Sequence, residues 1–151
     1  MKQTPEEFTK KCNKLTTKAK LPIKVHLKRG YDNAGYFVED RIITLGFPYT
    51  TERKLSLNTK LFRGLAKERG INKLIPKELS VFLHELGHGI HQLRYPVEFK
   101  EFEINYFAMD RFCLQEGEYE KLPLEVAANL EGVRFLVENK ELINNCFNTR
   151  L

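Results

Sequence analysis

The sequence predicts one α+β domain over residues 1–151, with an N-terminal helix, a small three-stranded antiparallel sheet and a helical second half. Three observations support this fold class. Apolar residues recur at helical spacing from residue 5, alternate with a period of two over residues 21–45, and return to helical spacing from about residue 58. A length of 151 residues is that of one ordinary domain, and no repeat or linker divides the chain.

The segment TPEEF predicts the start of the first helix. Thr4 is the expected N-cap, Pro5 takes the first helical position, and Glu7 stands three residues after the cap, as in a capping box. Apolar residues follow at helical spacing at Phe8, Cys12, Leu15 and Ala19. We therefore expect an amphipathic helix over residues 5–19.

Period-two alternation predicts the sheet. In LPIKVHLKRG the apolar and polar residues fall on opposite faces, which predicts a half-buried strand with His26 exposed. Two further short strands are expected over residues 36–39 and 41–45, joined by a tight turn near Asp40. Three consecutive short strands predict an antiparallel sheet.

Helical spacing predicts four helices after the sheet. Their predicted ranges are 58–70, 76–94, 97–113 and 124–145. Asn58 is the expected cap of the first of these, and the segment QEGEYEKLP before the last is expected to be a loop. The expected packing stripe of the last helix is Val126, Ala127, Leu130, Val133 and Leu136 or Val137.

The composition excludes several classes of protein. No run approaches the roughly 18 apolar residues of a membrane span, and the first residues lack the apolar core of a signal peptide, so we expect a cytoplasmic protein without a membrane partner. Three widely spaced cysteines predict neither disulfides nor a zinc ribbon. Residues 1–29 hold nine Lys or Arg and two Glu, but no interleaved aromatic pattern, so a solvated helix face is expected and nucleic acid is not the expected partner.

The segment VFLHELGHGIHQL carries three histidines inside an otherwise apolar helix. At 100° per residue, His84, His88 and His91 share one side, and the large aliphatic residues from Leu79 onward lie on the other. His84 and His88 are one turn apart, so both imidazoles can bind one ion, and Glu85 can hold a metal-bound water. HELGH is the HExxH pattern, which predicts a zinc site with Glu85 as its general base.

The third ligand is expected to be a carboxylate. No histidine follows His91, which lies roughly 10 Å of helix rise from His84 and is therefore expected to contact the second shell, the substrate or solvent instead. The candidates are Glu98, Glu101, Glu103, Asp110, Glu116, Glu118, Glu120 and Glu125. Glu125 is favoured because the small residues after it allow close helix packing, and because Asn129, one turn later, can accept the outer N–H of a ligating histidine.

The pair of segments LSVFLHELGHGIH and LEVAANLEGVRFL resembles the ImmA/IrrE type of gluzincin metallopeptidase. The resemblance implies a single metallopeptidase-like domain in which His84, His88 and Glu125 bind Zn²⁺ and Glu85 is the catalytic base. It also implies a protein substrate, such as a helix-turn-helix repressor of a mobile element or a stress response.

The expected function is therefore that of a zinc-dependent endopeptidase acting on one or few proteins. An alternative is a non-catalytic, zinc-containing regulatory or protein-binding module. His91, Tyr106 and Tyr119 are all candidates to contact the oxyanion or the substrate, whose backbone is expected to extend the small sheet as an added strand. The sequence predicts no oligomeric state.

Overall fold

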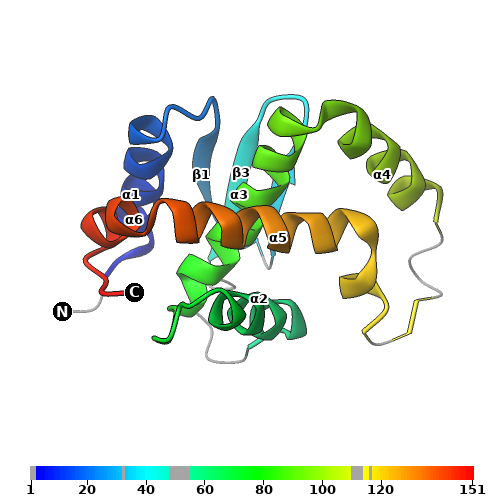
Figure 1. Ribbon diagram of the computed structural model, residues 1–151. Coiled ribbons are helices and arrows are strands. Elements are labelled where there is room, and N and C mark those ends of the chain that lie inside the picture. The colour runs from blue at the N-terminus through cyan, green and yellow to red at the C-terminus, as the bar shows by residue number, and fades with distance from the viewer. Residues whose placement is uncertain (1–2, 32, 48–54, 110–113, 116) are drawn as a thin grey trace.

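The computed structural model describes residues 3–31, 33–47, 55–109, 114–115 and 117–151, and within these ranges it confirms the α+β class (Figure 1). The described elements are α1 (Pro5–Lys18), β1 (Lys24–Arg29), β2 (Ala34–Phe37), β3 (Ile42–Phe47), α2 (Leu57–Glu68), α3 (Lys77–Arg94), α4 (Pro96–Ala108), the 3₁₀-helix η3 (Tyr119–Lys121), α5 (Pro123–Glu138) and α6 (Lys140–Phe147). None of these helices is long and apolar enough to cross a lipid bilayer.

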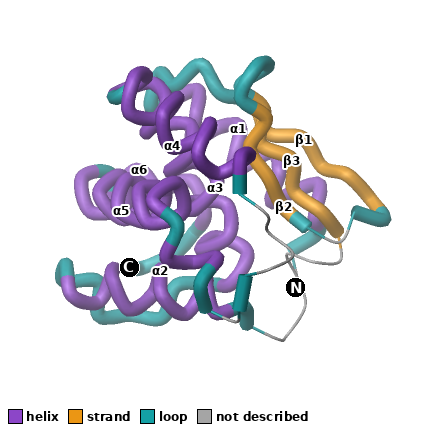
Figure 2. The backbone as a smooth tube through the Cα atoms, turned by 90° about the vertical axis from the view of Figure 1, so that its right-hand side faces the viewer, coloured by secondary structure: helices purple, strands orange, loops and turns teal. Residues whose placement is uncertain are grey.

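The sheet is mixed, so the prediction of an antiparallel sheet was wrong. In the described residues the strand order is β1-β3-β2, with β3 parallel to β1 and antiparallel to β2. The tight turn predicted near Asp40 does join β2 to β3, although β2 begins two residues earlier than predicted. β2 does not pair with β1, because one strand position separates them in the sheet. β3 occupies that position and runs parallel to β1. Figure 2 shows the three strands side by side on one flank of the molecule.

Helix α1 begins at the predicted capping box and occupies part of the outer edge of β1. The Thr4 hydroxyl accepts the Glu7 N–H, and the Glu7 carboxylate accepts the Thr4 N–H. The Asn13 side chain pairs with both backbone groups of Val25, at 2.8 and 2.9 Å. An edge strand exposes unpaired backbone groups, so this contact blocks β1 at Val25 against pairing with another chain. β2 is the other outer strand.

Helices α3 and α5 cross in close contact near the middle of the fold (Figure 1). A Cβ atom added at Gly87 would overlap the carbonyl oxygen of Ala128, and one added at Gly132 would overlap that of Leu83. The two backbones therefore meet directly. Every residue from Leu79 to His91 is buried, so the histidine side of α3 faces α5 and the cleft described below, rather than bulk solvent.

The last predicted helix is two helices, because it is interrupted at Asn139. The Asn139 side chain donates to the Phe135 carbonyl, and its φ of −120° departs from helical geometry. The predicted stripe is only partly correct: Val133 and Leu136 are buried, but Val126, Leu130 and Val137 are more than 40% exposed. The buried side of α5 carries Glu125, Ala128, Asn129, Glu131 and Gly132 in their place.

Three smaller corrections concern helix ends. The cap of α2 is Ser56, whose hydroxyl accepts the Thr59 N–H, and not Asn58. Helix α4 ends at Ala108, because Met109 is extended, and residues 110–113 of the predicted range, including Cys113, lie outside the described residues. The predicted loop before α5 contains the short helix η3.

Candidate metal centre

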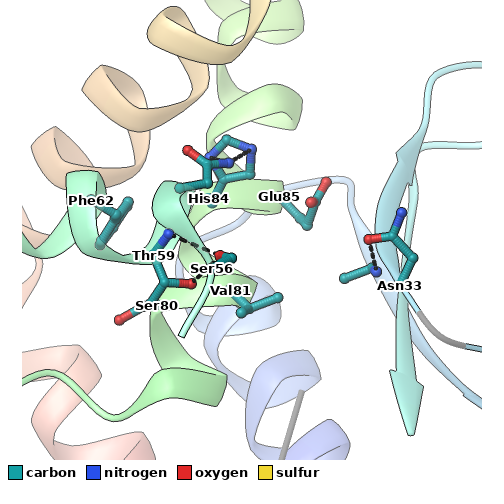
Figure 3. Close-up of a pocket in the computed structure, with 10 residues that line it drawn as sticks. Asn33, Ser56, Thr59, Phe62, Ser80, Val81, His84 and Glu85 are labelled. Atoms are coloured by element: carbon teal, nitrogen blue, oxygen red, sulfur yellow. Dashed lines mark hydrogen bonds between the residues drawn. The ribbon is translucent and has the colours of Figure 1, made fainter. Parts of the chain in front are cut away.

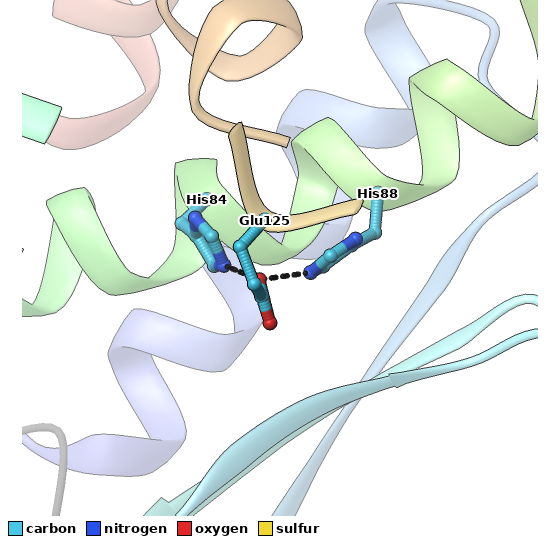
Figure 4. A group of neighbouring side chains, drawn as sticks. All are labelled: His84, His88 and Glu125. Carbon is cyan, nitrogen blue, oxygen red and sulfur yellow. Dashed lines mark hydrogen bonds and ion pairs between the residues drawn. The ribbon is translucent and has the colours of Figure 1, made fainter. Parts of the chain in front are cut away.

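Three predicted ligands come together where α5 begins above α3. Nε2 of His84 and Nε2 of His88 each lie 3.1 Å from Oε2 of Glu125, and the candidate ligand atoms of the three residues lie within 4.8 Å of one another (Figure 4). All three side chains are buried. This group could hold a metal ion, and it is the only group of its kind among the described residues.

The close crossing of α3 and α5 positions the group. His84 and His88 are one helical turn apart, and their rings meet edge to face with centroids 4.9 Å apart. Gly87 lies between the two histidines in the sequence, and Ala128 of α5 packs against it. Glu125 is three residues before Ala128, so this contact places Glu125 over both imidazoles. A residue larger than glycine at position 87 would push the carboxylate away.

A chain of two asparagines orients the His84 ring. Its Nδ1 donates to Oδ1 of Asn129 at 2.7 Å, the contact expected from the sequence. Asn129 in turn donates from Nδ2 to Oδ1 of Asn58 at 3.0 Å, and the Asn58 amide nitrogen lies 3.2 Å from His84 Nε2. A proton fixed on Nδ1 leaves Nε2 directed toward Glu125, where a metal ion would bind.

Asn58 is the residue that the sequence analysis missed in this group. Its position two residues after Ser56 was interpreted as a helix cap, a role in which asparagine is common. The sequence did contain a feature that could have indicated this role for Asn58. A second residue suited to capping, Ser56, precedes it by two positions. A helix needs only one N-cap, so the second side chain was free for another contact.

Glu85 is buried next to the candidate ligands but is not one of them. Figure 3 shows its side chain leaving α3 beside His84 and extending toward the sheet. Burial raises the pKa of the Glu85 carboxyl, an effect opposed by the charges of His84 and His88. The carboxyl lines a small cavity of about 40 Å³ with Asn58 and Ser80 and also the larger cleft in front of the ligands.

The larger cleft has a volume of about 260 Å³ and lies between β2 and α4. Residues 34–38 all line one side, and because successive side chains of a strand point to opposite faces, this continuous lining indicates that the edge of β2 borders the cleft. Glu85, His88 and Glu125 form part of the floor. The opposite wall is formed by Phe99, Glu103, Tyr106 and Phe107 of α4.

Two of the three predicted oxyanion or substrate contacts lie in this cleft. Tyr119 donates to Oε1 of Glu125 at 2.6 Å, and Tyr106 donates to the Tyr119 hydroxyl at 3.3 Å. Burial, together with the Glu125 charge, raises the pKa of the Tyr119 hydroxyl far above its usual range, so this group remains a hydrogen-bond donor.

His91 does not line the cleft. It is 1% exposed, which rules out contact with solvent as one of the three expected roles, and it lies against the rings of Phe99 and Phe102. Its Nε2 is 2.9 Å from the Glu98 carboxylate.

The charges in the ligand group favour the ionised carboxylate. Burial alone would raise the pKa of Glu125, but hydrogen bonds from His84 and His88 hold it well below its usual range. Burial likewise acts to lower the pKa of His84, but Glu125 and Glu85 together raise it to about 9. Two imidazole nitrogens and one carboxylate oxygen in a buried, oriented set fit a divalent transition metal.

Among the described residues, no other predicted candidate for the third ligand joins the group of His84 and His88. Glu98 pairs with His91, and Glu103 pairs with Lys100 on the cleft wall. Asp110 and Glu116 lie outside the described residues. Of the described candidates, Glu125 alone completes the group.

The chain matches none of the protein-family models, curated proteins and solved structures with which it was compared. We therefore infer the class of protein from the geometry and chemistry of the site.

Proposed function

We propose that the protein is a zinc-dependent endopeptidase that cleaves one or a few protein substrates. The observation that carries this proposal is the convergence of His84, His88 and Glu125, of which His88 and Glu125 lie at the floor of an open cleft together with Glu85. Two histidines and one carboxylate are a ligand set typical of catalytic zinc, which keeps one coordination position for water or substrate. A structural zinc site is usually closed by a fourth protein ligand.

Zinc held by these residues would supply a Lewis acid and a bound water of lowered pKa. Glu85 is the proposed general base, which accepts a proton from the attacking water and donates it to the leaving amine. Its position supports this role, because the Glu85 side chain is buried beside the candidate ligands and lines the cleft in which a substrate would bind.

We assign the contact with the developing negative charge to the Tyr119 and Tyr106 pair rather than to His91. Both hydroxyls line the cleft, and Tyr119 already donates to the Glu125 carboxylate. A neutral hydroxyl at this place can donate to the oxygen of the scissile carbonyl, where such donors lower the barrier.

The edge of β2 is the proposed docking site for the substrate backbone. β1 is blocked at Val25 by Asn13, whereas β2 borders the cleft along its length. An extended segment can pair with β2 through main-chain hydrogen bonds and so lie across the metal ligands. The resemblance to ImmA/IrrE peptidases supports a regulatory protein as substrate, with a transcriptional repressor of a mobile element or stress response as the implied class.

The variant Glu85→Gln separates catalysis from metal binding. It keeps the size of the side chain but removes the base, so we expect about one zinc per chain by elemental analysis, as in the wild type, and a rate lower by about 10²–10⁴. Cleavage can be followed by mass spectrometry on a peptide library. His84→Ala should lose both zinc and activity.

Two results would overturn the proposal. Absence of bound metal in the purified wild type would remove the zinc site. The second result concerns whatever effect the protein has when it is expressed in cells. If Glu85→Gln kept that effect and His84→Ala destroyed it, the protein would be a non-catalytic, zinc-containing regulatory or protein-binding module.

A further inference from the structure

Glu103 places a carboxylate in the α4 wall of the cleft. Its side chain is only 11% exposed. Among the described residues that line the cleft, the other carboxylates are Glu85 and Glu125, which the proposed reaction already uses. No lysine or arginine belongs to this described lining. Glu103 is therefore a charged group of the cleft that hydrolysis itself does not require.

The ion pair that Glu103 makes is a weak one. Its Oε1 is 3.1 Å from Nζ of Lys100, three residues earlier on the same helix. The Lys100 side chain is 69% exposed, and a pair of this kind between neighbours on a helix surface contributes little because water competes for the ammonium. A better-placed cation can displace Lys100 without leaving the buried carboxylate unpaired.

Three aromatic residues of α4 line the same wall as Glu103. Phe99 is four residues before it, and Tyr106 and Phe107 are three and four residues after it, so these rings share its side of the helix. Rings beside a carboxylate fit a long cationic side chain, whose methylene stem packs on the ring faces while its charge reaches the carboxylate. Arginine fits best, because its planar fork binds a carboxylate through two hydrogen bonds.

We propose that Glu103 selects substrates that carry arginine or lysine near the cleaved bond. This inference rests on the proposed function, since a segment lying along β2 has α4 on its other side and the metal ligands beneath it. The carboxylate and the rings then form one specificity pocket for a basic side chain.

The test uses quenched-fluorescent decapeptide libraries in which one position at a time is fixed as Arg, Lys, Gln, Leu or Glu. With the zinc-loaded protein we expect kcat/KM to be about 10- to 100-fold higher for Arg than for Gln at one position, the range of a charge-assisted hydrogen bond. Glu103→Gln should remove this preference, and Glu103→Lys should favour the Glu peptides. Lys100→Ala removes the competing ammonium and should raise the Arg preference.

Matched controls keep the result independent of folding and of catalysis. Glu101→Gln changes an exposed carboxylate on the same helix and should keep the wild-type preference. Melting temperature and zinc content identify any variant that misfolds. Binding of the same peptides to Glu85→Gln, measured by fluorescence anisotropy, reports selectivity without cleavage.

The outcomes distinguish the two proposals. If no peptide is cleaved but Arg peptides bind in a Glu103-dependent way, the specificity pocket stands and the peptidase function fails. If Arg and Gln peptides are cleaved and bound equally, if the preference survives Glu103→Gln, or if no peptide binds at all, the inference about Glu103 is overturned.

Discussion

A neutral imidazole carries its proton on one nitrogen and can bind a metal ion through the other. At His84 two asparagines determine that Nδ1 carries the proton and that Nε2 faces the candidate metal position. Asn129 accepts from Nδ1, and Asn58 on another helix accepts from Asn129 and so holds its amide in place. The orientation of one ligand therefore depends on residues from α2, α3 and α5 together.

The first prediction at this scale concerns those asparagines. Asn129→Ala should weaken zinc binding about 10- to 100-fold, and Asn58→Ala should weaken it less, because Asn58 acts through Asn129. Competition with a chromophoric zinc chelator measures both affinities. Asn72→Ala, at an exposed position, is the control. Wild-type affinity in Asn58→Ala would show that the amide chain does not orient the ligand.

The second prediction concerns the stability of the metal-free protein as the pH changes. The Glu125 and Glu85 carboxylates outweigh burial and raise the pKa of His84 from 6.5 to about 9. Because the folded value exceeds the unfolded one, the stabilisation is fully present below pH 6.5 and is lost as the pH rises through about 9. Urea denaturation in excess chelator at pH 6, 7.5 and 9 should therefore show a falling free energy of unfolding.

Glu125→Gln is the control for this pH dependence, because it removes the main group that raises the His84 pKa. Its free energy of unfolding should fall less over the same range. Zinc affinity should change in the opposite direction and increase with pH, since the metal binds the deprotonated imidazole. A metal-free stability that rises from pH 6.5 to 9 would contradict the ion pair.

Among the helices, the crossing of α3 and α5 decides whether the candidate centre forms. The contact has no side chain at Gly87 or Gly132, so the two backbones approach more closely than ordinary helix packing allows. The three candidate ligands are buried where these helices meet. Glycine within a helix costs stability, so its presence here reflects the close approach.

The third prediction tests this crossing. Gly87→Ala should destabilise the protein by about 1–3 kcal/mol, because the new methyl group overlaps the Ala128 carbonyl, and should reduce zinc content by displacing Glu125. Gly64→Ala in α2 is the matched control, because no atom lies within 4 Å of the added methyl group. It should be neutral or stabilise by up to about 1 kcal/mol. Chemical denaturation and zinc analysis measure both, and equal behaviour would refute the close contact.

For the whole molecule, the size of the cleft limits what the proposed enzyme can cleave. A volume of about 260 Å³ holds only a few side chains, so most unfolded segments gain little by binding. The remaining affinity must come from pairing with β2 and from surfaces of the substrate outside the cleft.

The fourth prediction is therefore selective proteolysis. We expect almost no digestion of casein at enzyme concentrations that cleave a partner protein completely. Co-expression of candidate proteins with the wild type, and with Glu85→Gln as a non-cleaving trap, identifies the partner as a protein captured by the variant and cut by the wild type. Broad digestion of unfolded proteins would contradict this selectivity.

Local patterns were sufficient for much of the candidate centre. The one-turn spacing of His84 and His88 follows from helical geometry, and the small residues after Glu125 indicated a close helix contact, which the structure contains. The boundaries of α1 and α3 were likewise predicted to within one residue, because capping residues and prolines act on their immediate neighbours.

The sequence by itself determined the fold class, the α1 and α3 helices and the pairing of His84 with His88, since these depend on periodicity and on side chains within a turn of one another. It favoured Glu125 as the third ligand, but the crossing of α3 and α5 brings that residue to the histidines. Only the tertiary structure decided the mixed sheet, the burial of the histidine side of α3, the contact of Asn58 and the place of Glu103 in the cleft wall. Each of these depends on which distant segments pack together, and hydrophobic contacts of that kind are non-directional, so the local pattern does not specify the partner.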